Sequence, residues 1–269
     1  MKKLKSPFFV AISLLAIIFA VSCQKNSTGD VPPGQLGLRL LLTDGPSIIF
    51  DSIFIDIRKA DIKIEKQDGT ELWQNLPIQA GIYNILGLRN GVEALLANTN
   101  IPAGKIEKLK LTLGTLNTAI KNGTSYPLSL HNSVNEFIID INDDVDEDGD
   151  ASHKKFWLDF DGAGSVVETS PGHYELNPSM HHFCHHSSGE VEGKVRPNDA
   201  QPVFVSAIIG SDTVTVRTER EGEFKFRGIL ASSIKLIIHP SNNYRDSVIN
   251  NILIHQGNDT NLGTIVLHR

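Results

Sequence analysis

Residues 53–58 read Ile53-Phe54-Ile55-Asp56-Ile57-Arg58, and this stretch decides the fold class. An isoleucine stands at every second position, and successive side chains of a β-strand point to opposite faces. The stretch therefore predicts a strand with one buried face. The same alternation returns in Leu109, Leu111 and Leu113, in Val203, Val205 and Ala207, in Val214 and Val216, and in Phe224 and Phe226.

Turn sequences separate many of these runs. They are Asp68-Gly69, Asn90-Gly91, Asn122-Gly123 and Glu221-Gly222. Short strands with closely spaced turns are typical of β-sandwiches and Greek-key barrels. The segment VEALLAN, Val92 to Asn98, predicts the one helix. We predict an all-β chain with two β-sandwich domains, immunoglobulin-like or prealbumin-like, and one short helix in the first.

The start of the chain predicts export. Lys2, Lys3 and Lys5 precede an almost wholly apolar run over 7–21. Because a membrane span needs roughly 20 apolar residues, this shorter run favours a signal peptide over residues 1–22. Ala20-Val21-Ser22-Cys23 resembles the lipobox of bacterial lipoproteins, which implies an acylated Cys23. Ordinary secretory cleavage near Ser22 is the alternative, since a leucine usually stands where Ala20 is.

The segment after Cys23 indicates a flexible tether over residues 23–35, because it is polar and rich in Pro and Gly. We therefore expect a cell-envelope protein held by its lipid anchor, with the membrane as its first partner. The outer membrane is the expected location, and the inner membrane is the alternative. Lipidation of Cys23 leaves Cys184 without a second thiol for an internal disulfide.

The composition limits the number of domains and the classes of partner that we expect. The 269 residues are 40% hydrophobic and 21% charged, which is enough material for one large or two ordinary domains. The net charge is −6 and no basic stripe is present, so we do not expect a nucleic-acid partner.

Residues 36–180 resemble the DUF4382 family of bacterial lipoproteins, known from Bacteroidetes, whose function is unknown. The resemblance is carried by Leu42-Thr43-Asp44-Gly45-Pro46, Phe50-Asp51-Ser52-Ile53, Leu88-Arg89-Asn90-Gly91, Leu95-Leu96, Ile101-Pro102-Ala103-Gly104, Leu111-Thr112-Leu113-Gly114, Trp157-Leu158-Asp159-Phe160-Asp161, Ser165-Val166-Val167 and Tyr174-Glu175-Leu176-Asn177-Pro178.

Residues 189–269 resemble the carboxypeptidase regulatory-like, prealbumin-like β-sandwich. The matching segments are Gly189 to Pro197, Val205-Ser206-Ala207, Glu221 to Phe226 and the closing Gly257 to Leu267. Ala231-Ser232-Ser233-Ile234 departs from the family's Pro-Gly-x-Tyr turn. The resemblance implies a spacer, and residues 181–188 form a His-rich linker before it.

Two clusters predict metal sites. Asp144, Asp146, Asp148 and Asp150 have the alternate spacing of a calcium loop, with Gly149 for the turn. Lys155 replaces the expected twelfth-position Glu, so a solvated acidic turn is the alternative. In the linker, His182, Cys184 and His186 would share one strand face and could suit zinc or copper. Alternate strand positions lie about 7 Å apart, so such a site needs a bend; solvated histidines are the alternative.

Three Asp-Ser/Thr-aliphatic tripeptides resemble the O-glycosylation sites of Bacteroidetes. They place candidate glycans on Thr213, Ser247 and Ser52. Ser52 stands at the start of a predicted strand, so its hydroxyl could instead be structural.

No catalytic motif is found in the sequence, and we predict no enzyme. Asp159 and Asp161 share a strand face and could form a carboxylate pair for glycoside hydrolysis. The leading hypothesis is a non-enzymatic envelope lipoprotein whose first domain binds a glycan, a surface protein or another ligand. The alternatives are a carbohydrate-active or other enzyme with an unrecognised site, and a subunit of a surface adhesive structure.

The anchor is tested by metabolic labelling with a fatty-acid analogue. The wild-type chain should incorporate label and fractionate with membranes, and Cys23→Ala should lose the label, because this thiol is the predicted acyl acceptor. Cys184→Ala is the matched control and should label normally. An unmodified N-terminus in the native protein would contradict the prediction.

Overall fold

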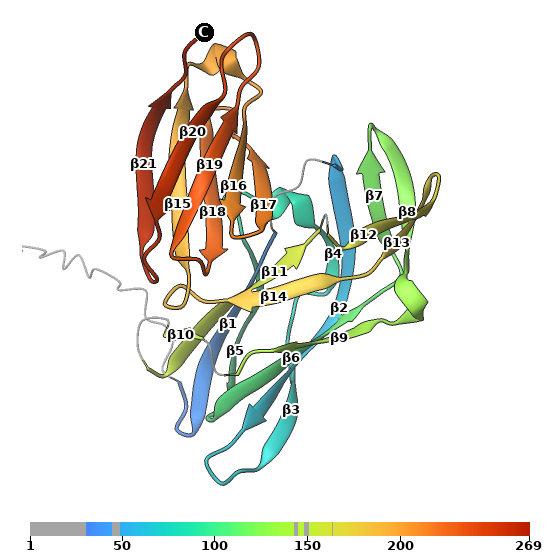
Figure 1. Ribbon diagram of the computed structural model, residues 1–269. Coiled ribbons are helices and arrows are strands. Elements are labelled where there is room, and N and C mark those ends of the chain that lie inside the picture. The colour runs from blue at the N-terminus through green and yellow to red at the C-terminus, as the bar shows by residue number, and fades with distance from the viewer. Residues whose placement is uncertain (1–30, 45–48, 143–144, 148–150, 163) are drawn as a thin grey trace, which may run out of the picture. The chain divides into compact units, whose positions relative to one another are not determined.

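The alternating stretch at residues 53–58 lies in the long strand β2 (Ser52–Glu65) of the computed structural model (Figure 1). The structure describes residues 31–44, 49–142, 145–147, 151–162 and 164–269. Its regular structure is almost entirely β-strand, as the alternation predicts, and the prediction of an all-β fold is confirmed.

A bulge in β2 explains why its alternation changes phase. Ile57 pairs with Leu113 and Lys59 pairs with Thr112 of β6 (Lys105–Leu113), so Arg58 is an extra residue. The bulge keeps Ile57 and Ala60 in the same core although three positions separate them. Arg58 Nε lies 2.6 Å from a carboxylate oxygen of the buried Asp56.

The first sandwich consists of two mixed sheets whose inner faces share one core. The first sheet has the order β10 (Asp146–Glu147), β11 (His153–Asp161), β1 (Gln35–Thr43) and β5 (Ala94–Pro102), and β14 (Ser179–Phe183) also pairs with β11. The second runs through β12 (Val166–Ser170), β13 (His173–Leu176), β8 (Thr124–Leu130), β7 (Asn117–Lys121), β2, β6 and β9 (Glu136–Asp140), while β3 (Glu71–Leu76) and β4 (Gly81–Asn84) pair with β2.

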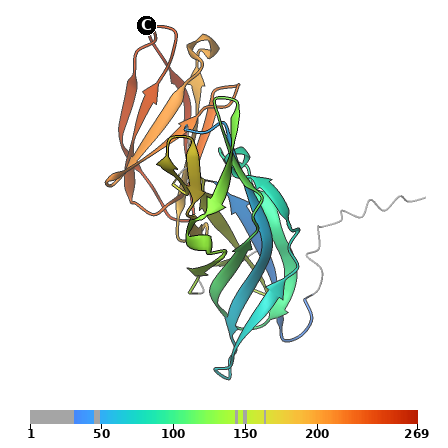
Figure 2. The same cartoon turned by 90° about the vertical axis from the view of Figure 1, so that its right-hand side faces the viewer.

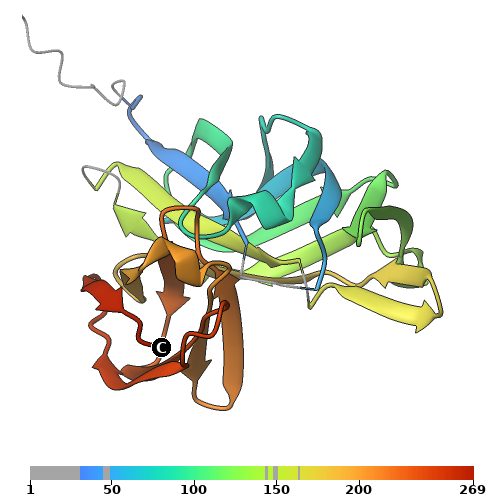
Figure 3. The same cartoon turned by 90° about the horizontal axis from the view of Figure 1, so that it is seen from above.

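The second sandwich has its own core and two smaller sheets. One has the order β18 (Glu223–Ile229), β15 (Gly189–Arg196) and β21 (Asp259–Val266), and the other β17 (Asp212–Arg217), β16 (Phe204–Ile209), β19 (Ser233–His239) and β20 (Ser247–Leu253). Figures 2 and 3 show these orange-to-red strands as a group distinct from the blue-to-yellow strands. The core residues of the two groups form separate clusters, so each sandwich buries its own apolar surface.

The helix predicted over Val92 to Asn98 is wrong, because this segment enters strand β5. Leu40 pairs with Ala97 and Leu41 pairs with Leu95, which leaves Leu96 as the extra residue of a bulge. Leu96 and Ala97 are therefore both buried although they are adjacent. A bulge interrupts period-two alternation, and here it imitates a helical pattern. The helical turns of the described residues are short 3-10 turns at Ile85–Leu88, His131–Ser133 and Asn198–Ala200.

The His-rich segment is part strand and part turn. His181, His182 and Phe183 lie in β14, whose partner is β11. The chain then turns at residues 185–187 before β15 begins. The expected linker over 181–188 is thus shorter in the structure, since its first three residues belong to a sheet of the first sandwich.

The signal peptide, Cys23 and most of the tether lie outside the described residues. Within the described ranges, no helix has the length and apolar character needed to cross a membrane.

Phe156 of β11 is completely buried in the first core and tests the sandwich. Phe156→Ala should lower the free energy of unfolding by about 3–5 kcal/mol, because it removes buried apolar surface and leaves a cavity. The measurement is denaturant unfolding. Val167→Ala, at an exposed position of β12, is the control and should change stability by less than about 0.5 kcal/mol. Equal losses in the two variants would contradict this core.

Candidate functional site

The ends of two parallel strands place acidic groups side by side. Strand β1 pairs with β11 in parallel, and Thr43 is the register partner of Asp159. Parallel strands finish at the same edge of a sheet, so Asp44, directly after β1, meets the end of β11. The amide of Gly162 donates a hydrogen bond of 2.9 Å to Asp44 Oδ1. This bond joins positions that are 118 residues apart in the chain.

Asp44 is buried with one oxygen unpartnered. Its residue exposure is 6%, and Oδ2 has no hydrogen-bond partner in the described part of the chain. Burial raises the pKa of Asp44 from 3.8 to about 8, and the nearby charges of Asp159 and Asp161 add to the rise. The Gly162 hydrogen bond and the charge of Arg89 act in the opposite direction. Asp44 is therefore mostly protonated at neutral pH.

Asp159 has a histidine partner across the sheet. It faces His181 in the β11–β14 register, and His181 Nε2 lies 3.3 Å from Asp159 Oδ2. The hydrogen bond to Asp159 raises the pKa of His181. Asp161 has a different local role, because its Oδ1 accepts a hydrogen bond of 2.8 Å from the Gly164 amide and so closes the turn after β11.

These groups line one side of a cleft with a volume of about 610 Å³. The second sandwich supplies the other side through Ile209, Asp212, Thr213, Val214, Phe226, Gly228, Ile229, Leu230 and Ala231. Leu230 is 69% exposed and lies on this wall of the cleft. The cleft thus has an acidic side and a side that combines apolar residues with Asp212 and Thr213.

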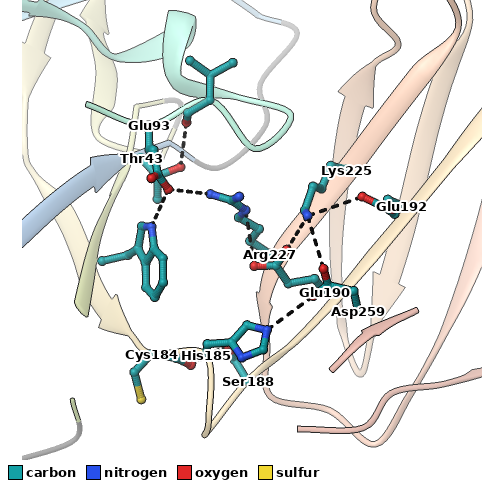
Figure 4. Close-up of polar contacts among 12 residues, drawn as sticks. Thr43, Glu93, Cys184, His185, Ser188, Glu190, Glu192, Lys225, Arg227 and Asp259 are labelled. Atoms are coloured by element: carbon teal, nitrogen blue, oxygen red, sulfur yellow. Dashed lines mark hydrogen bonds and ion pairs between the residues drawn. The ribbon is translucent and has the colours of Figure 1, made fainter. Parts of the chain in front are cut away.

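The two basic side chains in the cleft wall already have carboxylate partners. Lys225 Nζ lies 2.6 Å from Glu190, and Arg227 lies 2.8 Å from Glu93 and 3.3 Å from Glu190. Figure 4 shows these contacts converging around Arg227. Glu93 also accepts a hydrogen bond of 2.7 Å from the Trp157 indole. These two positive charges are therefore already paired with Glu190 and Glu93, which lie outside the acidic cluster.

Specific contacts hold the two walls together at the cleft. Arg227 of β18 reaches Glu93 of the first sandwich, and Asn90 Nδ2 donates to the Arg217 carbonyl at 3.0 Å. Within the first sandwich, Phe183 stacks on Trp157, with ring centroids 5.6 Å apart. The backbone of Gly228 approaches Phe183 so closely that a Cβ at this glycine would lie 3.0 Å from the ring.

The predicted His–Cys set is only partly assembled. His182 lies in β14 with its ring edge-on to Phe156. Cys184 and His186 lie beyond the strand, and the turn supplies the bend that a compact site requires. Their Sγ and Nε2 atoms are 3.7 Å apart. Asp146, predicted for calcium, is the third member of this group.

Of the predicted calcium ligands, Asp144, Asp148 and Asp150 lie outside the described residues. Asp146 is buried in the short strand β10. Its two carboxylate oxygens accept hydrogen bonds from the backbone amides of His185 and His186. These bonds lower the pKa of Asp146 despite its burial. Asp146 is thus committed to the turn at residues 185–187.

The three predicted glycosylation residues lie on different strands. Ser52 begins β2 and is half-buried, Thr213 is exposed in β17, and Ser247 begins β20 and is half-buried. Thr213 also lines the cleft.

A family model described as "Domain of unknown function (DUF4382)" matches residues 37–178, which is more than half of the chain. The chain belongs to the DUF4382 family. Comparison with curated proteins gives no match.

Several solved structures share weak similarity with this DUF4382 chain. A type II cohesin–X-dockerin complex from Acetivibrio cellulolyticus is 21% identical over 29% of this chain and 56% of its own, with a TM-score of 0.25. The Bacillus anthracis TIE protein is 12% identical over 87% of this chain and 34% of its own, with a TM-score of 0.22. The shaft pilin SpaA of Lactobacillus rhamnosus GG is 8% identical over 87% of this chain and 97% of its own, with a TM-score of 0.20. The chain thus spans about half the length of the cohesin–X-dockerin chain and about a third of the length of the TIE protein.

Two DUF4382-like segments that are distant in the sequence meet in the cleft. Asp44 belongs to Leu42–Pro46, and Asp159 and Asp161 belong to Trp157–Asp161. The sequence identified Asp159 and Asp161 as a carboxylate pair, but Asp44 and His181 were not predicted as partners of that pair. The missing information was the parallel β1–β11 pairing, which alternation within single strands cannot reveal.

The raised pKa of Asp44 predicts a pH-dependent stability. Between the ordinary pKa of 3.8 and about 8, the folded state retains a proton that the unfolded state has lost. The contribution of Asp44 to the stability of the folded state is therefore complete below its ordinary pKa of 3.8. It is lost as the pH rises through the raised pKa of about 8. Wild-type stability should fall relative to Asp44→Asn by a few kcal/mol across this window, since each pKa unit is worth about 1.4 kcal/mol.

Urea unfolding of both proteins at intervals from pH 4 to pH 9 measures this difference. The asparagine keeps an acceptor for the Gly162 amide, and every other titrating group is common to the two proteins. Parallel stability curves would show that Asp44 titrates normally.

Proposed function

We propose that this DUF4382 protein is a non-enzymatic binding protein of the bacterial cell envelope, and that the cleft binds an organic cation with an apolar portion. The observation that carries the proposal is the acidic cluster at the ends of β1 and β11, built around the buried hydrogen bond from Gly162 to Asp44. The cluster opens into a cleft large enough for a small organic molecule.

The charge of the cleft supports a cationic head group. Asp159 Oδ1 is buried without a hydrogen-bond partner in the described residues, as is Asp44 Oδ2. An unpaired buried polar oxygen is costly, and an ammonium or guanidinium group would supply the missing donors once a small side-chain movement exposes these oxygens to the cleft. The same cation would favour loss of the Asp44 proton, because the charged carboxylate is then stabilised.

The opposite wall supports an apolar body. The exposed Leu230 lines it from the loop after β18, and the buried Phe226 and Ile229 of β18 lie beneath it. Ligand pockets commonly combine an apolar lining with a few polar groups that set orientation. A primary amine on an alkyl or aromatic stem, or a basic side chain of a peptide, has this chemistry.

The second domain has a larger role in this proposal than that of a spacer. Its strands β17 and β18 carry cleft residues, and Arg227 links it to Glu93 of the first domain. We propose that it completes the binding surface whose acidic half belongs to the DUF4382 domain.

The cellular placement of the proposal rests on the sequence. The apolar leader and the lipobox-like Ala20-Val21-Ser22-Cys23 support a lipid anchor, and the polar segment up to residue 35 supports a tether. We propose that the two sandwiches are held in this way at the outer membrane, where the cleft can meet ligands outside the cytoplasm.

A dansyl-labelled primary alkylamine tests the cleft directly. The full chain in detergent should bind it with enhanced fluorescence, and at least tenfold more tightly than the N-acetylated probe, which has no charge. Asp159→Asn should weaken binding by about 10–100-fold, because a hydrogen bond to a charged group contributes roughly 1.5–3 kcal/mol. Affinity should rise from pH 6 to pH 9 as Asp44 and His181 lose their protons.

Glu71→Gln is the control, since Glu71 is an exposed carboxylate on β3 and does not line the cleft. Equal affinity for the amine and its acetylated form would reject the cationic ligand, as would equal effects of Asp159→Asn and Glu71→Gln. Release of reducing sugar from a polysaccharide by the wild type, but not by Asp44→Asn, would replace binding by glycoside hydrolysis with Asp44 as general acid.

A further inference from the structure

Three metal-ligating side chains converge where the chain leaves the first sandwich. Cys184 directly follows β14, His186 lies in the turn before β15, and Asp146 lies in β10. One ligand atom from each lies within 4.8 Å of the others. Two of these residues come from the His-rich segment and one from the acidic segment, so the group forms only in the folded chain.

The distance between the thiol and the imidazole suits a tetrahedral metal ion. Cys184 Sγ and His186 Nε2 are 3.7 Å apart. Zinc lies about 2.3 Å from sulfur and about 2.0–2.1 Å from nitrogen, which gives an S···N separation of roughly 3.5 Å at a tetrahedral angle. An ion therefore fits between the two atoms with little movement of either side chain.

Asp146 orients the imidazole for this role. Its Oδ1 lies 2.8 Å from His186 Nδ1 and also accepts the His186 backbone amide at 2.8 Å. A proton on Nδ1 leaves the lone pair of Nε2 directed toward the sulfur. A carboxylate that holds the far nitrogen of a ligating histidine is a common feature of zinc sites.

We propose that Cys184 and His186 bind a zinc ion, with Asp146 as the positioning residue and water completing the coordination. Thiolate and imidazole are both favoured zinc ligands. The Ser187 hydroxyl lies 2.9 Å from Sγ and would hydrogen-bond to the thiolate. His182, whose ring packs against Phe156, is not a ligand in this arrangement.

Burial favours a metal ion over a nucleophilic role for the same three residues. Cys184 is completely buried, with 0% exposure, so a substrate carbon has no approach to Sγ. The His186 side chain is 58% exposed, and a small ion could enter from that side. The neighbouring group of His185, Glu190 and Asp259 is a weaker candidate, because the ammonium of Lys225 lies against Glu190 and Asp259.

A metal at this position would have a structural consequence. The turn at residues 185–187 is the connection between the two sandwiches, and Asp146 belongs to the first. Zinc bound to Cys184 and His186 would hold this connection in one conformation. The inference does not depend on the ligand proposed for the cleft.

Cobalt and zinc titrations of the full chain in detergent test the proposal, with Cys23→Ala present so that Cys184 is the only thiol. We expect one zinc ion per chain by calorimetry and a thiolate-to-cobalt charge-transfer absorption with Co²⁺. Cys184→Ser should abolish this absorption, and Asp146→Asn should weaken zinc binding by about 10–100-fold. His185→Gln is the matched control and should bind zinc as the parent does.

Absence of the charge-transfer absorption in the parent would overturn the proposal, and this result does not depend on the folding of any variant. Zinc binding that is unchanged in Cys184→Ser but reduced in His185→Gln would identify adventitious binding by surface histidines and would also overturn it. Circular dichroism without metal establishes that each variant is folded before it is compared.

Discussion

The parallel pairing of β1 with β11 is the constraint on which the candidate site depends. It brings the ends of two strands, 118 residues apart at the Asp44–Gly162 hydrogen bond, to one edge of a sheet. The cost of burying a carboxyl group at that edge appears as the raised pKa of Asp44. A buried, mostly protonated Asp44 differs from an ordinary surface aspartate, which is charged and hydrated at neutral pH. The acidic cluster follows from this alignment, and the β11–β14 register then adds His181 to it.

The second sandwich turns the acidic edge of the first into one wall of a cleft. The acidic edge itself is built by the first sandwich, because Gly162 and His181, the partners of Asp44 and Asp159, both belong to it. With β17 and β18 alongside, the same groups form one side of a cleft whose other side combines apolar residues with Asp212 and Thr213. The ion pair between Arg227 and Glu93 and the packing of Phe183 near Gly228 hold this arrangement. Binding at the cleft and metal binding at Cys184 and His186 would both act on the junction of the two sandwiches.

Two bulges explain where prediction from the sequence succeeded and where it failed. In β2 the bulge at Arg58 follows three clean alternations, so the strand was predicted and only its change of phase was missed. In β5 the bulge at Leu96 lies near the start of the strand, and the adjacent apolar residues were interpreted as a helix. A bulge is defined by how a strand pairs with its partner strand, and the periodicity of one segment contains no information about that pairing.

The sequence by itself determined the β class, the number of sandwiches, the resemblance to DUF4382 and the expectation of an exported, anchored chain, because each of these depends on local pattern. Only the tertiary structure decided which residues share a site. Asp44 joins Asp159 and His181 through strand pairing across more than a hundred residues, and Asp146 meets Cys184 and His186 because the chain turns after β14. Side-chain spacing along a strand is set by covalent geometry, whereas contact between distant segments is set by the burial of a shared core.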